Sequence, residues 1–349
     1  MKVYKIIIST IILSGCAAVE RVPSASNLES QIASANVIDR REAVSSYICS
    51  KTINVSHINC VNETTLPQKL SDNTKMDDDW PYIDNSDVPK YHFVSGIFGE
   101  CFSDLFPTFD ETISALESNG FKTNRIQVKG RGSVLENSSI IISEFGTDRV
   151  KHGPHEINIV VGYSKGGLDI LEALERSKSL QNHIDAILLL SVPIFGTPEI
   201  EISSISKFFA INTEFEKCDI GSDNLFEAIG VEFRNSKMMN WSFPSNIQIY
   251  SLATAAVEEK RVSLPMRKGF RRMIESELPN DGQVPFYSQM LPESTFLGVV
   301  PVDHWELALN TPFANRNKPE NQFLRSEFLP LILEYIAGNV LRSNGLRRY

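Results

Sequence analysis

The segment between residues 157 and 175 constrains the fold more than any other part of the sequence. Residues 157–161, rich in isoleucine and valine, have the composition of a buried strand. The strand stops at Gly162-Tyr163-Ser164-Lys165-Gly166, and residues 169–175 place apolar side chains at helical spacing. A turn this sharp requires residues without a Cβ atom, which the two glycines of the run supply. A strand that turns directly into a helix is typical of a parallel sheet with crossover helices.

The alternation of strand and helix patterns extends over most of the chain. Strands are predicted at residues 91–94, 121–128, 157–161, 184–192, 247–252 and 295–300, and helices at residues 108–119, from 133 onward, 169–175 and 322–340. Short apolar strands separated by helices favour one α/β domain with a mostly parallel sheet. We place this domain at residues 91–345, a length that can bury a substantial core.

The strand, turn and helix around Ser164 resemble the nucleophile elbow of the α/β-hydrolase superfamily. The resemblance implies that Ser164 is the catalytic nucleophile and that the chain has the α/β-hydrolase fold, with helices flanking the sheet. Many lipases of the superfamily have histidine before the serine, where this chain has Tyr163. A packing turn without a catalytic role is the alternative, whereas a phosphate-binding loop needs a different glycine spacing. A dyad of Ser164 with Lys165 is disfavoured because adjacent side chains diverge.

A serine nucleophile needs an imidazole base and a carboxylate, which the superfamily supplies in the chain order serine, acid, histidine. Only His183 and His304 follow Ser164. His183 precedes the strand predicted at residues 184–192, so it lies at the edge of the sheet opposite the nucleophile. His304 follows the strand predicted at residues 295–300 and lies at the correct edge. We therefore predict that His304 is the general base, with a purely structural histidine as the alternative.

The acid is predicted from the run Asn280-Asp281-Gly282-Gln283-Val284-Pro285. An Asp-Gly turn followed by Val-Pro resembles the acid loop of bacterial lipases and esterases, which implies that Asp281 is the catalytic acid. The same turn also occurs without any function, because its residues tolerate unusual backbone angles. Asp303 is the competing carboxylate, but a residue adjacent to His304 rarely reaches the far nitrogen of the imidazole. We expect Asp303 to fix the loop instead.

The resemblance also implies an oxyanion hole made of two backbone N–H groups. One donor is Lys165, the residue after the nucleophile. The other belongs to the run Ser95-Gly96-Ile97-Phe98-Gly99, which is similar to the His-Gly-x-x-Gly loop of lipases with Ser95 in place of the histidine. Position by position, the similarity assigns the N–H of Ile97 as the second donor. Because a backbone group donates, the change of side chain at residue 95 does not remove it.

Residues 198–245 separate two predicted strands and are longer than an ordinary connection. The segment is rich in phenylalanine, methionine and tryptophan. In this superfamily such an interval commonly carries a cap or lid, which would line an apolar acyl pocket and exclude water. The other interpretation is a helical insertion that buries its own aromatic side chains, and the sequence does not decide between the two.

The N-terminus has the pattern of an export signal. Residues 1–15 combine two lysines with a short apolar run and end in Leu-Ser-Gly before Cys16. These residues resemble the lipobox of bacterial lipoproteins, which implies cleavage before Cys16, acylation of its thiol and a lipid anchor in the bacterial cell envelope. Ala17 favours the outer membrane, since aspartate there would favour the inner one. A plain secretory signal is the alternative, and residues 16–90 are assigned to a lipidated tether and N-terminal extension.

Charge and histidine spacing argue against two kinds of partner. The formal net charge is −9 and becomes more negative once residues 1–15 are removed. Such an acidic surface disfavours nucleic acid, whose binding requires basic patches. His152 and His155 have no acid or cysteine at ligand spacing, so we expect neither a metal site nor a cofactor.

The cysteines after Cys16 are Cys49, Cys60, Cys101 and Cys218, and an exported protein can oxidise them. Proximity in the sequence favours a disulfide between Cys49 and Cys60, with buried free thiols as the alternative. Cys101 lies beside the predicted oxyanion loop, where either a disulfide that stiffens the loop or an unpaired thiol fits the sequence.

These residues together predict a serine hydrolase of carboxylic esters, lipase- or esterase-like, that acts on an acyl-ester or lipid substrate through an acyl-enzyme. Thioesterase and phospholipase A activities use the same triad and are the alternatives within this class. A non-catalytic surface lipoprotein that keeps the fold is the alternative of a different class. The order of Ser164, Asp281 and His304 along the chain argues against it.

Overall fold

The computed structural model describes residues 25–51, 88–101, 103–104, 106–146, 156–198, 224–244, 246–310 and 318–343. Several features predicted from the sequence lie outside these ranges. They are the signal peptide with Cys16, the two cysteines at 60 and 218, the two histidines at 152 and 155, and residues 199–223 of the insertion.

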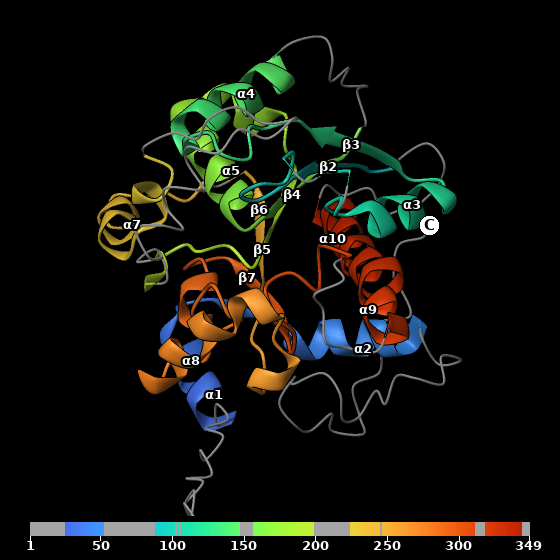
Figure 1. Cartoon of the computed structure of the whole chain (residues 1–349). Coiled ribbons are helices and arrows are strands. Elements are labelled where there is room, and N and C mark those ends of the chain that lie inside the picture. Colours follow the sequence, from blue (N-terminus) through green and yellow to red (C-terminus); the bar gives the residue numbers. More distant parts are fainter. Residues whose placement is uncertain are drawn as a thin grey trace, which may run out of the picture.

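Seven parallel strands form one sheet, which confirms the predicted α/β architecture (Figure 1). The strands are β1 (Ile38–Asp39), β2 (Lys90–Val94), β3 (Lys122–Ile126), β4 (Asn158–Tyr163), β5 (Ala186–Leu190), β6 (Gln248–Thr254) and β7 (Thr295–Val300). Their order across the sheet is β1-β7-β6-β5-β4-β2-β3, and every neighbouring pair is parallel. Six of these strands coincide with those predicted from apolar runs.

Helices cover both faces of the sheet (Figure 1). The α-helices are α1 (Ala25–Ser34), α2 (Arg41–Lys51), α3 (Asp110–Ser118), α4 (Val134–Gly146), α5 (Lys165–Arg176), α7 (Val231–Met238), α8 (Arg267–Glu275), α9 (Lys318–Phe323) and α10 (Leu329–Ser343). Short 3₁₀ segments are η1 (Lys178–Asn182), η3 (Glu227–Ile229), η4 (Glu259–Arg261), η5 (Leu264–Met266) and η6 (Phe286–Gln289), and a π-helical turn, η7 (Leu324–Phe328), joins α9 to α10. Helices α2, α3 and α10 contribute to one apolar cluster, and α4 and α5 contribute to another on the opposite face. None of the described helices combines the length and apolarity that a membrane-spanning segment needs.

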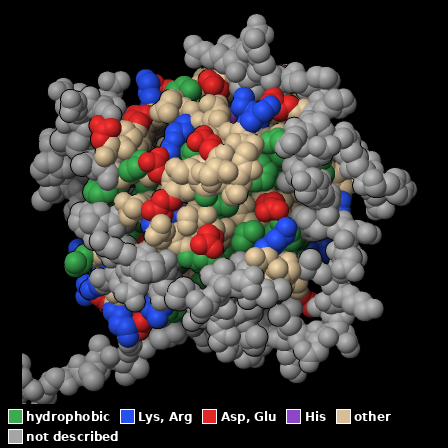
Figure 2. Space-filling view, turned by 90° about the vertical axis from the view of Figure 1, so that its right-hand side faces the viewer, with side chains coloured by type: hydrophobic (Ala, Val, Ile, Leu, Met, Phe, Trp, Pro, Cys, Tyr) green, Lys and Arg blue, Asp and Glu red, His purple; other side chains and the backbone are tan. Residues whose placement is uncertain are grey.

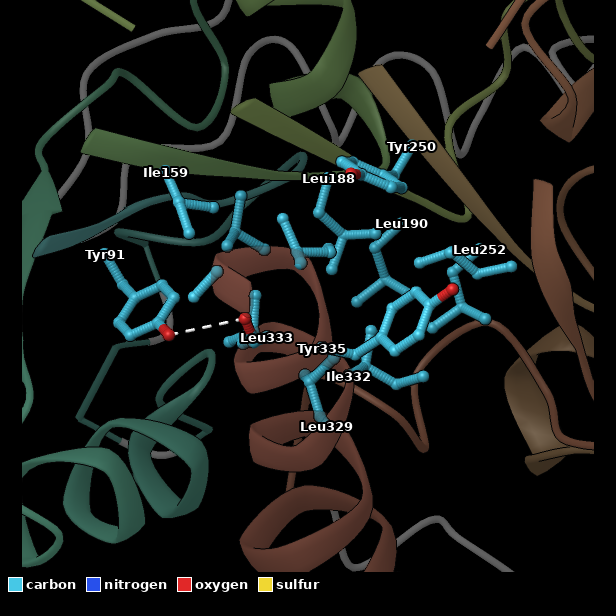
Figure 3. Packing of buried hydrophobic residues seen from close by; sticks show 14 of the residues in the cluster. Tyr91, Ile159, Leu188, Leu190, Tyr250, Leu252, Leu329, Ile332, Leu333 and Tyr335 are labelled. Atoms are coloured by element: carbon cyan, nitrogen blue, oxygen red, sulfur yellow. Dashed lines mark hydrogen bonds between the residues drawn. The ribbon is translucent and has the colours of Figure 1, made fainter. Parts of the chain in front are cut away.

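The central strands are buried on both faces, which explains their nearly continuous apolar sequences. In β5, Leu188 and Leu190 belong to the cluster under α10, whereas Ile187 and Leu189 belong to the cluster under α5. All four side chains are fully buried, as the alternation of side chains along a strand requires. Figure 3 shows Leu188 and Leu190 packed against α10, where the hydroxyl of Tyr91 donates a 3.3 Å hydrogen bond to a helix carbonyl.

The chain reverses its direction of travel across the sheet at β2. From β2 it moves outward to the edge strand β3, and then returns to β4 on the other side of β2. At such a switch point the two connecting segments part in opposite directions and leave a crevice at the carboxyl ends of the strands. The loop after β2 and the turn after β4 therefore meet there, with Val94 paired to Gly162.

The N-terminal extension contributes to the domain, a role that its assignment as a tether did not anticipate. β1 pairs with β7, and the N–H of Ile38 donates to the carbonyl of Ser294 at 2.9 Å. From α2, Val44, Tyr47 and Ile48 lie in the same apolar cluster as α10. A two-residue strand carries no periodicity, so sequence patterns do not reveal it.

The described part of the long insertion, residues 224–244, packs on the sheet beside α5. Leu225 and Phe226 are buried in the cluster under α5. Lys237 of α7 forms ion pairs with Glu172 and Glu175 of α5, at 3.0 and 3.1 Å. Leu225 and Phe226 are thus buried, whereas Phe233 and Met239 stay exposed, and a cap formed by residues 198–245 stays a prediction.

The packing of α2 predicts that Tyr47→Ala lowers the free energy of unfolding by about 3–5 kcal/mol, because a buried aromatic side chain is removed. Tyr47 is 2% exposed and its ring lies 5.5 Å from that of Tyr335. Urea denaturation measures the change. The matched control is Ile38→Ala at a side chain that is 52% exposed, which should change stability by less than about 0.5 kcal/mol. Equal and small effects of the two substitutions would show that the extension is a tether after all.

Candidate active site

The turn after β4 holds Ser164 in a strained conformation. Its φ of 53° and ψ of −128° lie in a region that side-chain-bearing residues rarely occupy. The N–H of Ser164 donates to the carbonyl of Leu190 at 2.9 Å, which ties the turn to β5. A Cβ atom on Gly162 would lie 2.6 Å from the Cα of Gly167, so the sharp turn requires glycine there. The side chain of Ser164 is thereby presented at the carboxyl edge of the sheet.

The structure brings Ser164, His304 and Asp281 together in one hydrogen-bonded chain. The Nε2 atom of His304 lies 2.9 Å from the Oγ of Ser164, and its Nδ1 lies 2.7 Å from the Oδ2 of Asp281. His304 is 2% exposed and Asp281 is fully buried. The N–H of His304 also donates to the carbonyl of Asp281 at 2.9 Å. The imidazole is thus fixed between a hydroxyl and a carboxylate.

Backbone and side-chain donors hold the carboxylate of Asp281. Its Oδ1 accepts hydrogen bonds from the N–H groups of Gln283 and Val284, at 2.9 and 2.7 Å. Its Oδ2 accepts from the hydroxyl of Thr254 at 2.8 Å and from Nε2 of Gln289 at 3.3 Å. The Asp-Gly turn therefore does more than reverse the chain, because its own N–H groups orient the carboxylate.

Thr254 and Gln289 are site residues that the sequence analysis missed. The amide of Gln289 accepts from the N–H of Thr254 at 2.7 Å and donates to its carbonyl at 2.9 Å. The hydroxyl of Ser191 lies 2.8 Å from that of Thr254 and extends the cluster. A buried threonine in a strand and a glutamine in a turn have no distinctive spacing, so no sequence signal identified them.

Asp303 lies beside His304 but does not bind its imidazole. Its carboxylate accepts hydrogen bonds from the N–H groups of Ser263, Trp305 and Glu306, at 2.7, 2.9 and 3.1 Å. Burial raises the pKa of Asp303. The side chain holds the loop that carries His304, as we expected of it.

Tyr163, at the position where many lipases have histidine, contacts His304 through both its hydroxyl and its ring. Its hydroxyl donates to the carbonyl of His304 at 2.8 Å, and the two rings lie 5.2 Å apart. Burial, together with the nearby carboxylates of Asp281 and Asp303, raises the pKa of Tyr163 well above its ordinary value. The hydroxyl therefore stays protonated and can donate.

The loop after β2 lies against Ser164. A Cβ atom on Gly96 would lie 2.9 Å from the Cβ of Ser164. Within the described part of the chain, neither the N–H of Ile97 nor that of Lys165 donates to a protein acceptor. These two N–H groups are the donors that the predicted oxyanion hole needs, and their role stays a prediction.

Several solved structures have a similar fold. A metagenomic carboxyl esterase superposes with a TM-score of 0.75 over 90% of this chain and 99% of its own, at 20% sequence identity. The chain has the α/β-hydrolase fold. The mature form of a Bacillus licheniformis lipase matches with a TM-score of 0.53 and 16% identity over 72% of this chain and 92% of its own. The Staphylococcus hyicus lipase matches with 0.52 and 12% identity over 74% and 97%. Searches of protein-family models and of curated protein sequences find no match.

The side chain of Lys165 is buried and pairs with Asp169. Its Nζ lies 2.9 and 3.0 Å from the two carboxylate oxygens, and the side chains are 2% and 1% exposed. Burial raises the pKa of Asp169 from 3.8 to about 6, although the ammonium of Lys165 opposes the shift. The lysine is thus engaged away from Ser164, in agreement with our exclusion of a dyad.

Cys49 and Cys101 are both disulfide-bonded, which excludes the free-thiol alternative for these two residues. Cys49 lies in α2, and Cys101 follows the predicted oxyanion loop. The pairing of Cys49 with Cys60 stays a prediction, because Cys60 lies outside the described ranges.

The remaining histidines and acids form no metal centre in the described ranges, where no three of the residue types that bind metals converge. His183 caps η1 just before β5, at the edge of the sheet opposite Ser164.

The pKa of Asp169 predicts a pH-dependent difference between the protein and Asp169→Asn. Because the folded state binds this proton more tightly than the unfolded state, raising the pH from about 4 to about 6 favours the unfolded chain. Relative to the asparagine variant, the wild type should lose up to about 3 kcal/mol of unfolding free energy over this range. Urea denaturation at several pH values between 4 and 7 measures both curves. A difference that grows with pH in favour of the wild type would contradict the raised pKa.

Proposed function

We propose that this protein is a serine hydrolase that cleaves carboxylic esters through an acyl-enzyme. The observation that carries the proposal is the hydrogen-bonded chain from Ser164 through His304 to Asp281, which begins at a strained turn. This arrangement has the geometry of a nucleophile, its base and the group that orients the base. The carboxyl esterase and the two lipases that share the fold support an ester as the substrate.

In the first half of the proposed reaction, Nε2 of His304 takes the proton of the Ser164 hydroxyl as its oxygen attacks the ester carbonyl. Asp281 holds the imidazole through Nδ1 and stabilises the imidazolium that forms. The negative oxygen of the tetrahedral intermediate accepts hydrogen bonds from the N–H groups of Ile97 and Lys165. Collapse breaks the bond to the alcohol, which leaves with the proton from His304.

In the second half, His304 removes a proton from a water molecule, which attacks the acyl-enzyme. The same two donors bind the second tetrahedral intermediate, and His304 returns the proton to the oxygen of Ser164. The carboxylic acid product then leaves, and the site returns to its initial state. No further group is required to balance the protons.

A fluorophosphonate probe tests the nucleophile directly. The wild type should become labelled at neutral pH, and Ser164→Ala should not, because the probe reacts with an activated serine. Ser179→Ala, at an exposed serine beyond the other end of α5, is the matched control and should label like the wild type. His304→Ala should lower kcat for p-nitrophenyl butyrate by roughly 10⁴-fold or more. Failure of the folded wild type to label, or undiminished turnover by His304→Ala, would refute the mechanism.

We further propose that the mature protein is tethered to the bacterial envelope, in the outer membrane, through acyl chains on Cys16. The support is the run of residues that ends at Cys16, which resembles a lipobox. An acyl anchor would hold the ester-cleaving domain beside lipid, since each buried methylene contributes about 0.8 kcal/mol.

Metabolic labelling with an alkyne-bearing palmitate in a bacterial host tests the anchor. The wild type should incorporate the label and fractionate with membranes, whereas Cys16→Ser should do neither. Cys49→Ser, at a residue engaged in a disulfide, is the control for loss of a cysteine and should keep the label. Absence of label from a wild type that is nevertheless exported would support a plain secretory signal instead.

A further inference from the structure

The ion pair between Lys165 and Asp169 takes no part in the proposed proton transfers. Both side chains are almost completely buried, at 2% and 1% exposure. Removing two charges from water costs folding free energy, and apolar residues of similar size often stabilise a protein as well as a buried ion pair does. A contribution to stability therefore does not account for the pair. Its neighbours offer a different explanation.

Asn137 of α4 connects the ion pair to the loop after β3. Its Nδ2 donates to Oδ2 of Asp169 at 2.8 Å and to the carbonyl of Lys129 at 2.9 Å. Its Oδ1 accepts from the N–H of Lys129 at 3.1 Å. Asn137 is fully buried, and both the oxygen and the nitrogen of its amide are hydrogen-bonded. The backbone at residue 129 is thereby held in a fixed position relative to α5.

The next residue, Gly130, holds the oxyanion loop. Its carbonyl accepts a 3.0 Å hydrogen bond from the N–H of Phe98. A Cβ atom on Gly130 would lie 2.9 Å from the Cα of Phe98, so the two backbones are in direct contact. Phe98 has a φ of 62°, a left-handed conformation that surrounding contacts must maintain in a residue with a side chain. Phe98 directly follows Ile97, the second predicted oxyanion donor.

These contacts run without a gap from one predicted donor to the other. We propose that Lys165, Asp169 and Asn137 form a positioning network that fixes the N–H groups of Ile97 and Lys165 relative to each other, so that both reach the same oxyanion. The inference rests on the proposed ester hydrolase. The three side chains touch no reacting atom. They act through the start of α5 on one side and through Lys129, Gly130 and Phe98 on the other.

The test combines steady-state kinetics with a transition-state analogue. Asp169→Asn and Asn137→Ala should lower kcat for p-nitrophenyl butyrate by roughly 10- to 100-fold and change KM by less than about 2-fold, because only the oxyanion needs both donors. An alkyl trifluoromethyl ketone forms a tetrahedral oxyanion on Ser164. Its affinity should fall by the same factor as kcat/KM. Near-UV circular dichroism establishes whether each variant is folded. If one of the two variants fails to fold, the kinetics of the other carry the test.

Lys237→Met is the matched control, since it removes the ion pairs that Lys237 forms with Glu172 in the middle of α5 and with Glu175 near the C-terminal end of that helix. It should leave kcat and the inhibitor affinity within about 2-fold of the wild type. A fall in kcat without loss of affinity for the ketone would indicate partial unfolding and overturn the network. Unchanged kcat in folded Asp169→Asn and Asn137→Ala would also overturn it, while an active wild type preserves the proposed function. A folded but inactive wild type would overturn both proposals.

Discussion

The close approach of three backbone segments at Ser164 is the constraint on which the rest of the site depends. A Cβ atom on Gly166 would lie 2.5 Å from the carbonyl oxygen of Ser95, and one on Gly167 would lie 2.2 Å from the side chain of Val192. Helix α5 can therefore begin in contact with the loop after β2 and with the end of β5 only because these two positions lack side chains. The crossing of the chain from β2 to β3 and back to β4 brings the loop after β2 and the turn at Ser164 together at the carboxyl ends of the strands. The strained serine lies at this contact, and the imidazole of His304 is hydrogen-bonded to its hydroxyl.

Local patterns predict the parts of the structure that depend on neighbouring residues. The apolar run of β5 and the glycines around Ser164 place the sheet and the turn, because burial and backbone sterics act within a few residues. Chain order, together with the resemblance of the Asp-Gly turn to the acid loop of lipases, predicts the pairing of His304 with Asp281. The sequence does not predict the pairing of β1 with β7, since a two-residue strand is specified by a partner at the other end of the chain. Charge adds little to the prediction: on the face in Figure 2, acidic and basic side chains of the described residues are interspersed.

The buried carboxylates of Asp281 and Asp169, near the turn at Ser164, are held by the same arrangement of hydrogen bonds. In each case a side-chain amide binds both the N–H and the carbonyl of one backbone residue and donates to the carboxylate with the same nitrogen. Gln289 does this between Thr254 and Asp281, and Asn137 does it between Lys129 and Asp169. An amide suits this position because it offers a donor and an acceptor without adding charge. Gln289 thereby holds the predicted acid, and Asn137 holds Asp169, the ion-pair partner of the lysine that follows Ser164.

The pairing of β1 with β7 has a consequence for how the protein is made. The strand at residues 38–39 leaves the ribosome first, but its partner at residues 295–300 leaves last among the strands. Until β7 is available, β1 has no strand edge to join, and a partly formed sheet would expose an unpaired edge able to pair with another chain. β7 also leads directly to His304, so the partner of β1 and the predicted catalytic base become available at the same late stage of synthesis.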